Sequence, residues 1–261
     1  MSSRTEVRAD RIMKVILRTG EISVQELVEQ VCTSETSIRR DLARLEKRGL
    51  VLRTYGGATL VVPLLSKPLA HDTALQAREL WSAGAKRRIG VVASELIGEH
   101  EIIGLNAGTT TTQIARALRH RSDIVVITNA VNIGMELSNQ QSIKTRMTGG
   151  TLASAWNFAL TGQPTLNFLR DIYLDKVFIA VTGFDLEFGI TTLESEDAAV
   201  SLAMIRNARR VIVVADSGKM GKVSPALICS ISSIHVLVTD SNLPQKIHEQ
   251  LISRGIEVIL A

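Results

Sequence analysis

TSETSIRRDLARLEKRGLV, residues 33–51, decides the fold of the first part of the chain. On a helix that turns by about 100° per residue, Ile38, Leu42 and Leu45 lie on one side and predict a core-facing stripe. The other side and its flanks offer hydroxyl and basic groups from Thr36, Ser37, Arg39, Arg40, Arg44 and Lys47. A recognition helix presents its N-terminal residues to base edges in the major groove, so this pattern predicts a DNA-reading helix.

The residues before this helix predict two shorter helices. Ile12, Val15 and Ile16 share one face of the first helix. Ser23 and Glu26 have the S-x-x-E spacing of a capping box, which predicts that the second helix begins there. Two short helices, a tight turn and a third helix together predict a helix-turn-helix.

A turn and a wing flank the DNA-reading helix. Ser34 is placed to cap this helix and Gly49 to end it, while Cys32, in the turn, is expected to be a small buried packing residue. Residues 50–60 read as two short strands, a wing from which Arg53 contacts the DNA backbone or minor groove. The N-terminal side chains of the helix are expected on bases and the later ones on phosphates. The predicted DNA contacts are Ser34, Thr36, Ser37, Arg39, Arg40, Arg44, Lys47 and Arg53.

The composition is that of a mildly basic globular protein. Its 30 basic and 26 acidic residues give a formal net charge of +4, which neither demands nor excludes nucleic acid as a partner. Cys32 and Cys229 are the only cysteines and the five histidines are scattered, so we expect no disulfide framework, no metal site and no cofactor. We find no signal peptide and no apolar run that could span a membrane, and we expect a cytoplasmic protein without membrane contact.

From residue 81 onward, short apolar runs alternate with amphipathic stretches. The runs are 102–105, 124–127, 177–181, 211–215, 236–238 and 256–260, with a more polar edge strand expected at 143–148. The amphipathic stretches include 111–119, 198–208 and 244–254. Such alternation predicts a mostly parallel α/β sheet covered on both faces. We therefore expect a winged helix-turn-helix domain at residues 1–60, a linker at 61–80 and an α/β domain at 81–261.

The loops after these apolar runs are candidates for a ligand site, because ligands of open α/β sheets bind beyond the carboxyl ends of the strands. In GLNAGTTTTQ, residues 104–113, Gly108 lets the backbone approach a ligand closely. The N–H groups that follow lie at a helix N-terminus, where the helix dipole favours phosphate. Five such loops predict a small anionic ligand. The residues that they contribute are Asn106, Gly108, Thr109, Thr110, Thr111, Thr128, Asn129, Gly149, Gly150, Gly183, Asp185 and Lys219.

The chain resembles a known family from about residue 6 to its end. Its first domain is similar to the N-terminal winged helix of the DeoR family of bacterial sugar-operon regulators, over the stretch EISVQELVEQVCTSETSIRRDLARLEKRGLVLRTYGGA. Its second domain resembles that family's sensor domain in four motifs, NAGTTT at 106–111, TN at 128–129, GG at 149–150 and DSGK at 216–219. The resemblance implies a sensor similar in fold to ribose-5-phosphate isomerase and glucosamine-6-phosphate deaminase, which binds phosphorylated sugars.

The resemblance also assigns two residues and marks three departures. Asp41 matches an acidic residue after two arginines, and its position suggests that it supports them. Glu196 matches an acidic helix of the sensor domain and joins the predicted ligand contacts. Where the family has an aspartate, a second aspartate and a lysine, this chain has Asn106, Thr182 and Ser201, which predicts a different sugar phosphate or weaker binding.

Three classes of function account for parts of this sequence: a DNA-binding regulator, an enzyme and an RNA or single-strand binder. The leading hypothesis is a repressor of a sugar or polyol operon, a dimer or tetramer that releases double-stranded operator DNA when a phosphorylated sugar binds; an activator is left open. A phosphosugar isomerase or deaminase would explain the ligand loops but not the first sixty residues, so we expect no enzyme. An RNA or single-strand binder is disfavoured because aromatic residues, which supply stacking platforms, make up only 3% of the chain.

Overall fold

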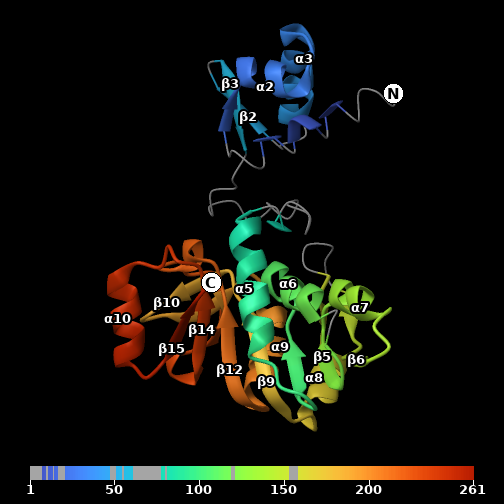
Figure 1. The fold of residues 1–261 in the computed structure, drawn as a ribbon, viewed down its shortest axis with the longest axis vertical. Coiled ribbons are helices and arrows are strands. Elements are labelled where there is room, and N and C mark those ends of the chain that lie inside the picture. The colour runs from blue at the N-terminus through green and yellow to red at the C-terminus, as the bar shows by residue number, and fades with distance from the viewer. Residues whose placement is uncertain are drawn as a thin grey trace. The chain divides into compact units, whose positions relative to one another are not determined.

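The computed structural model forms two compact units, Met1–Trp81 and Ser82–Ala261 (Figure 1). The described residues are 8–9, 11–13, 15–16, 21–47, 51–54, 56–60, 78–79, 81–118, 121–152 and 158–261. Each unit has its own hydrophobic core. The predicted linker, residues 61–80, lies almost wholly outside the described residues, so the domain boundaries that it sets stay a prediction.

The first unit is a helix-turn-helix followed by a wing. Helical residues between 8 and 16 precede β1 (Glu21–Ser23), α2 (Val24–Val31), α3 (Glu35–Lys47), β2 (Val51–Thr54) and β3 (Gly57–Leu60). The strands form an antiparallel sheet in the order β1-β3-β2, so the wing has a third strand that the sequence did not predict. Ile38, Leu42 and Leu45 of α3 are at most 1% exposed, which confirms the core stripe. They belong to one core with Ile12 and Ile16 of the first helix.

Local hydrogen bonds set the two ends of α2. The N–H of Glu26 donates to Ser23 Oγ (3.2 Å) and the N–H of Ser23 donates to Glu26 Oε2 (2.9 Å), so the predicted capping box is present. The hydrogen bond from the Ser23 backbone holds the pKa of Glu26 below its ordinary value. Cys32, expected to be buried, is exposed. The expectation was wrong because Cys32, with φ 53°, takes the left-handed position that closes α2 at the surface.

The second unit is built on a seven-stranded parallel sheet. In spatial order the strands are β15 (Glu257–Leu260), β14 (Val236–Thr239), β12 (Ala208–Val214), β9 (Leu174–Ala180), β4 (Ile102–Leu105), β5 (Ile124–Thr128) and β6 (Ile143–Met147). Every neighbouring pair is parallel. All seven strands were expected from the apolar runs and the polar edge segment, so the predicted α/β fold class is confirmed.

Helices cover both faces of this sheet. One face is covered by α5 (Ala83–Glu95), α6 (Thr109–Ala117) and α7 (Val131–Leu137), and the other by α8 (Gln163–Arg170), α9 (Ser195–Arg206) and α10 (Gln245–Ser253). Ile89 and Ile114 lie in the core under the first group, and Met204 and Leu251 in the core under the second. Among the helices that the structure describes, none is both long and apolar enough to cross a membrane.

Two small antiparallel sheets lie outside the main sheet. β10 (Gly183–Asp185), β11 (Gly189–Thr192) and β13 (Ala226–Cys229) form one, and β7 (Thr151–Leu152) and β8 (Leu160–Thr161) form the other. The three-stranded sheet packs on α9. Two short 3₁₀ helices, η2 (Ser217–Lys219) and η3 (Ile231–Ser233), complete the connections. Neither sheet was predicted from the sequence, because their strands are only two to four residues long, too short to show a clear alternation of apolar and polar residues.

The strand order of the main sheet reverses once. The chain runs outward from β4 through β5 to β6, then returns to β9 on the other side of β4 and runs outward to β15. The switch point therefore lies between β4 and β9. In open α/β sheets, ligands bind in the crevice outside the carboxyl ends of the strands at such a point. The fold thus places the ends of β4 and β9 at the centre of the candidate ligand site.

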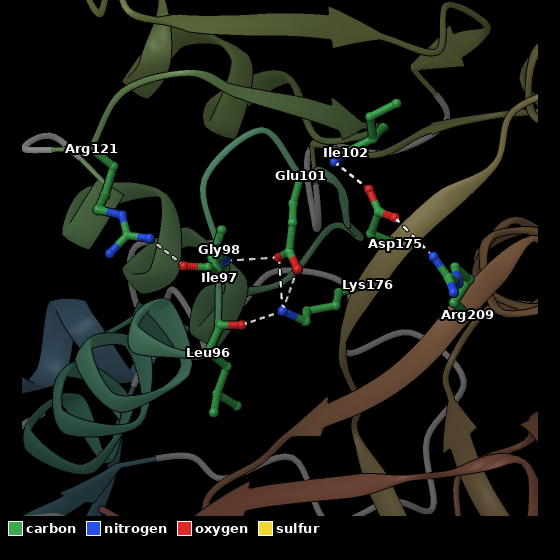
Figure 2. A network of polar contacts seen from close by, with 9 residues as sticks. All are labelled: Leu96, Ile97, Gly98, Glu101, Ile102, Arg121, Asp175, Lys176 and Arg209. Atoms are coloured by element: carbon green, nitrogen blue, oxygen red, sulfur yellow. Dashed lines mark hydrogen bonds and ion pairs between the residues drawn. The ribbon is translucent and has the colours of Figure 1, made fainter.

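A polar network closes the opposite, amino-terminal edge of the sheet (Figure 2). Lys176 of β9 donates to both carboxylate oxygens of Glu101 (2.6 and 2.8 Å) and to the carbonyl of Leu96, just after α5 (2.6 Å). Glu101 also accepts from the N–H of Gly98 (2.8 Å). The two charged side chains are only 16% and 22% exposed. The network therefore ties the end of α5 to β9 and to the segment that enters β4.

Lys176→Met would leave the Glu101 carboxylate without its cation in a largely buried position. We expect the free energy of unfolding of the second unit to fall by about 3 kcal/mol. Arg209→Ala is the matched control, since Arg209 is 86% exposed and 3.9 Å from Asp175. Such surface pairs contribute at most about 1 kcal/mol. Urea unfolding followed by circular dichroism measures both losses, and equal losses would contradict the role assigned to Lys176.

Candidate functional site

The exposed face of α3 carries most of the predicted DNA contacts. Thr36, Arg39 and Arg40 are all exposed. The guanidinium of Arg39 is engaged, because it forms an ion pair with Glu35 (2.7 Å). Arg40 has no hydrogen-bond or ion-pair partner among the described residues. A guanidinium that the protein does not engage can bind guanine O6 and N7 bidentately, so Arg40 is the side chain best placed to read a base.

Asp41 lies beneath this face and is 1% exposed. Its Oδ2 is 2.5 Å from Nε of Arg8, and its Oδ1 is 3.5 Å from Nη1 of Arg44. The hydrogen bond to Asp41 raises the pKa of Arg8 above its ordinary value. Asp41 was expected to support Arg39 and Arg40, which precede it, but its partners are Arg8 and Arg44 instead, because its side chain points into the core and toward the first helix. These contacts link α3 to the first helix.

Two serines bond to each other at the start of α3. Ser34 Oγ donates to Ser37 Oγ (3.0 Å), while the Ser34 carbonyl accepts from the N–H of Ser37 (3.0 Å). Ser34 thus lies at the start of the helix, as expected of a cap. Its hydroxyl, however, bonds to the Ser37 side chain and accepts no hydrogen bond from a backbone N–H of the described residues. The side chains of Lys47 and Arg53 lie outside the described residues, so their roles stay predictions.

Four consecutive threonines form the buried first turn of α6, directly after Gly108. Each is at most 5% exposed. The hydroxyls of Thr111 and Thr112 donate to the carbonyl of Gly108 (2.9 and 2.7 Å), so they hold the shape of the loop. The hydroxyls of Thr109 and Thr110 have no hydrogen-bond partner among the described residues. These two groups are therefore available to a ligand.

The backbone of the same turn favours an anion. The N–H groups of Thr109, Thr110 and Thr111 have no partner among the described residues, as is usual for the first turn of a helix. Together with the helix dipole they make a binding position for phosphate or carboxylate. Gly108 allows the turn to lie against β9, since a Cβ on it would be 2.4 Å from the Cβ of Ala180.

A hollow lies beside this turn, at the carboxyl ends of β4, β5 and β9. Its volume is about 10 Å³, which is room for about one water molecule, and it is lined by Asn106, Ala107, Asn129, Ala180, Thr192, Asp197 and Ser201. Small-molecule pockets usually hold roughly 300–1,000 Å³, so this hollow admits one small polar group of a ligand and not a sugar ring. Its lining is polar and has one carboxylate, that of Asp197.

The two predicted residues after β5 shape this hollow. Asn129 Oδ1 accepts from the N–H of Ala107 (3.0 Å), and its Nδ2 donates to the Leu160 carbonyl (3.1 Å). Thr128 is fully buried and its hydroxyl donates to the carbonyl of Leu105 (2.8 Å). Asn129 therefore lines the hollow and ties the loop before α6 to β8, while Thr128 joins the ends of β4 and β5.

The other three predicted glycines lie outside the lining of the hollow, and two of them allow close chain crossings. Gly149 and Gly150 have φ of +67° and +118°, and a Cβ on Gly150 would lie 2.1 Å from Thr165 Oγ1. That hydroxyl donates to the Gly149 carbonyl (2.7 Å). A Cβ on Gly183 would lie 2.4 Å from the carbonyl oxygen of Lys222. At Gly150 and Gly183 a larger residue would push the crossing segments apart, whereas at Gly149 the positive φ is what favours glycine.

The remaining predicted ligand residues, two acids and a lysine, also lie outside the lining of the hollow. Glu196 accepts a hydrogen bond from the Thr161 hydroxyl (2.6 Å), which ties α9 to β8. Asp185 Oδ1 accepts from two N–H groups of the β10–β11 turn (2.8 and 3.0 Å). Lys219 is the last residue of η2, and its side chain is partly exposed. Asp185 therefore closes a turn, and Glu196 holds two elements together.

Sequence reasoning assigned no ligand contact to much of the lining. Asp197 and Ser201 are four residues apart, so they project from one face of α9. Thr192 ends β11, and Ala180 ends β9. The four-residue spacing of Asp197 and Ser201 indicates a shared helix face, but residues on a helix that packs over the strand ends are not found by inspecting the strand ends alone. Within the described part of the chain, no group of three or more His, Cys, Asp or Glu residues is placed to hold a metal ion.

Known proteins match both units. Residues 8–63 match the family described as "DeoR-like helix-turn-helix domain", and residues 81–241 the one described as "DeoR C terminal sensor domain". The putative aga operon transcriptional repressor of Escherichia coli O157:H7 is 31% identical over 256 residues, covering 98% of this chain and 94% of that protein. The glycerol-3-phosphate regulon repressor of Escherichia coli K12 is 28% identical, covering 97% of this chain and 98% of that protein.

Solved structures match about half of the chain at low similarity. Ribose 5-phosphate isomerase A from Methanocaldococcus jannaschii covers 52% of this chain and 53% of its own, with 15% identity and a TM-score of 0.38. A likeness of this extent carries no functional information. The similarity of the two relatives, by contrast, extends over both units of the chain.

Gly108→Ala would bring a Cβ to 2.4 Å from the Cβ of Ala180 and push the first turn of α6 away from β9. We expect a loss of about 1–3 kcal/mol in the free energy of unfolding, measured by thermal denaturation. Gly84→Ala is the control, because the nearest atom to its new Cβ lies 3.8 Å away. In a helix that change stabilises by up to about 1 kcal/mol. Unchanged stability of Gly108→Ala would refute the close packing of this turn.

Proposed function

Because this chain belongs to the DeoR family of transcriptional regulators, it is a DNA-binding regulator, and we propose that it represses an operon for a sugar or polyol until a phosphorylated sugar binds its second unit. One observation carries the effector part of the proposal. The first turn of α6 offers unengaged N–H groups and the free hydroxyls of Thr109 and Thr110 beside a polar hollow. Two relatives named as repressors, of an aga operon and of a glycerol-3-phosphate regulon, support repression over activation.

The DNA-binding part of the proposal centres on α3. Arg40 and Thr36 are exposed on the N-terminal half of the helix, where recognition helices contact base edges. Arg44 lies one turn further along, where phosphates are the expected partners. We propose a symmetric homo-oligomer, dimer or tetramer, in which two copies of α3 bind half-sites about 34 Å apart or at a multiple of that distance.

The effector part of the proposal assigns two positions to one ligand. Its phosphate binds the first turn of α6, through the N–H groups and the hydroxyls of Thr109 and Thr110. One oxygen of its sugar or polyol portion enters the hollow, where Asn129, Asp197 and Ser201 offer polar contacts. The hollow is smaller than a whole sugar phosphate needs, which is consistent with the phosphate remaining outside it.

Two adjacent helices connect this position to the start of the second unit. The end of α5 is fixed at the amino-terminal edge of the sheet by Lys176, so α5 begins at the opposite edge, where the first turn of α6 also lies. The two helices touch closely, since a Cβ on Gly90 would be 2.5 Å from the Cβ of Gln113. We propose that a bound effector shifts α6 and with it α5. The effector regulates DNA binding only if it binds one arrangement of α5 better than the other.

The enzyme alternative is not retained. The family and the relatives that cover nearly the whole chain are transcriptional regulators. An isomerase or deaminase would also leave the exposed face of α3 without a role.

Arg40→Ala tests the assignment of base readout. We expect operator binding to weaken by roughly 1–3 kcal/mol, with specificity relaxed at one base pair and little change on unrelated duplex DNA. Electrophoretic or fluorescence titration against both duplexes measures this. Arg206→Ala, an exposed arginine on α9, is the control and leaves both affinities unchanged. An equal loss on both duplexes would make Arg40 a phosphate contact.

The effector is tested by titrating the full chain on duplex DNA from upstream of its own gene, with and without sugar and polyol phosphates. We expect one of these compounds to release the operator, while its unphosphorylated form does not, because the first turn of α6 binds an anion. Thr110→Val replaces an unengaged hydroxyl with a methyl group of similar volume, and we expect it to weaken release of the operator by that compound. Specific DNA binding that no phosphorylated compound alters would refute the proposed effector.

A further inference from the structure

The crevice at the switch point between β4 and β9 is closed by a side chain. Asn106 directly follows β4, and Ala180 is the last residue of β9. Asn106 Oδ1 accepts from the N–H of Ala180 (2.8 Å), and its Nδ2 donates to the carbonyl of Ala180 (3.0 Å). The side-chain amide thus continues the hydrogen bonding between β4 and β9 beyond the end of β4. It holds the two strand ends together at the point where the sheet would otherwise open.

The same amide reaches α9. Nδ2 of Asn106 donates its second hydrogen to Ser201 Oγ (3.1 Å), and both residues are at most 4% exposed. Both amide hydrogens are therefore used within the protein, and Asn106 has no N–H left to offer a ligand. Aspartate in its ionised form has no hydrogen to donate, so it could bond neither the Ala180 carbonyl nor Ser201 in this way. The arrangement requires an amide at this position.

Ser201 is the group that this arrangement leaves available. Its oxygen accepts from Asn106, and its own hydrogen remains to be donated. Ser201 lines the hollow together with Thr192 and Asp197. The lining therefore offers the hydroxyls of Ser201 and Thr192 and the carboxylate of Asp197, and none of the described lining residues carries a positive charge.

We propose that Asn106 is a positioning residue and Ser201 a specificity-determining residue that donates its hydroxyl hydrogen to an uncharged oxygen of the effector. The site then takes a monophosphate of a neutral sugar or polyol and disfavours a ligand with a second anionic group. This inference rests on the proposed function, in which the single phosphate binds the first turn of α6. A second anion in the hollow would lose its hydration beside the Asp197 carboxylate, while none of the residues that the structure describes around the hollow carries a positive charge. Burying a charge without a partner is costly.

Matched pairs of compounds test the preference, each pair differing by one additional anionic group. The pairs are glucose 6-phosphate with 6-phosphogluconate, fructose 6-phosphate with fructose 1,6-bisphosphate, and glycerol 3-phosphate with 3-phosphoglycerate. Each is titrated against the full chain bound to its operator. We expect the wild-type protein to be released by a neutral member at a concentration at least tenfold lower than by its more anionic partner. The reverse preference would overturn the proposal.

Two substitutions of Ser201 separate specificity from structural support. Ser201→Ala removes the donor and should weaken the response to the neutral compound about tenfold. Ser201→Lys supplies a cation and should shift the preference toward the more anionic member of the pair by at least tenfold. Ser253→Lys, at the end of α10, adds the same charge away from the hollow and leaves the preference unchanged. An unchanged preference ratio in Ser201→Lys would overturn the role of Ser201.

The positioning role of Asn106 is tested independently by thermal unfolding. Asn106→Asp should lower the midpoint of thermal unfolding by about 5 °C. Ser201→Lys in the same protein should restore part of that loss, because the ammonium can donate to the new carboxylate. Additive effects of the two substitutions would overturn the coupling between these residues. If no compound releases the wild-type protein, the proposed function and the effector class fail together, while the unfolding measurements still decide the coupling.

Discussion

The second unit depends on the pairing of β4 with β9, because the two halves of the main sheet meet only along these strands. The approach is close, since a Cβ on Gly104 would be 2.7 Å from Leu174 Cδ1. One end of the pair is held by the ion pair of Lys176 with Glu101, and the other by the amide of Asn106. The reversal of strand order creates the crevice, and these contacts set its width.

A buried carboxylate has a comparable part in the first unit. Burying a charge is costly unless it is paired, and Asp41 is paired on one side with the first helix through Arg8 and on the other with Arg44. Its neighbour Arg40 has no such partner among the described residues. The unit therefore separates arginines that hold the helix from an arginine left free for DNA.

Most elements of the fold could be predicted from local patterns in the sequence. The parallel strands follow from apolar runs, and the core stripe of Ile38 follows from helical spacing. The small sheet on α9 was not predicted, because its strands are three or four residues long and β13 pairs with β11 across more than thirty residues of chain. In the site, the strand-end rule found Asn106 and Asn129. Ser201, which a helix brings to the hollow from almost a hundred residues away, lies at no strand end and was marked only by the resemblance to the family. Neither source indicated that the Asn106 amide is hydrogen-bonded to β9.

The two edges of the main sheet have separate roles, one structural and one in ligand binding. The network around Lys176 secures the architecture at the amino-terminal edge, whereas the loops that face a ligand lie at the carboxyl edge. After a gene duplication, substitutions at the carboxyl edge could redirect such a regulator to another metabolite while its descendants inherit an undisturbed scaffold. Asn106 is the exception, because it belongs to both the scaffold and the site. Its replacement would require a compensating change on α9 within the same lineage.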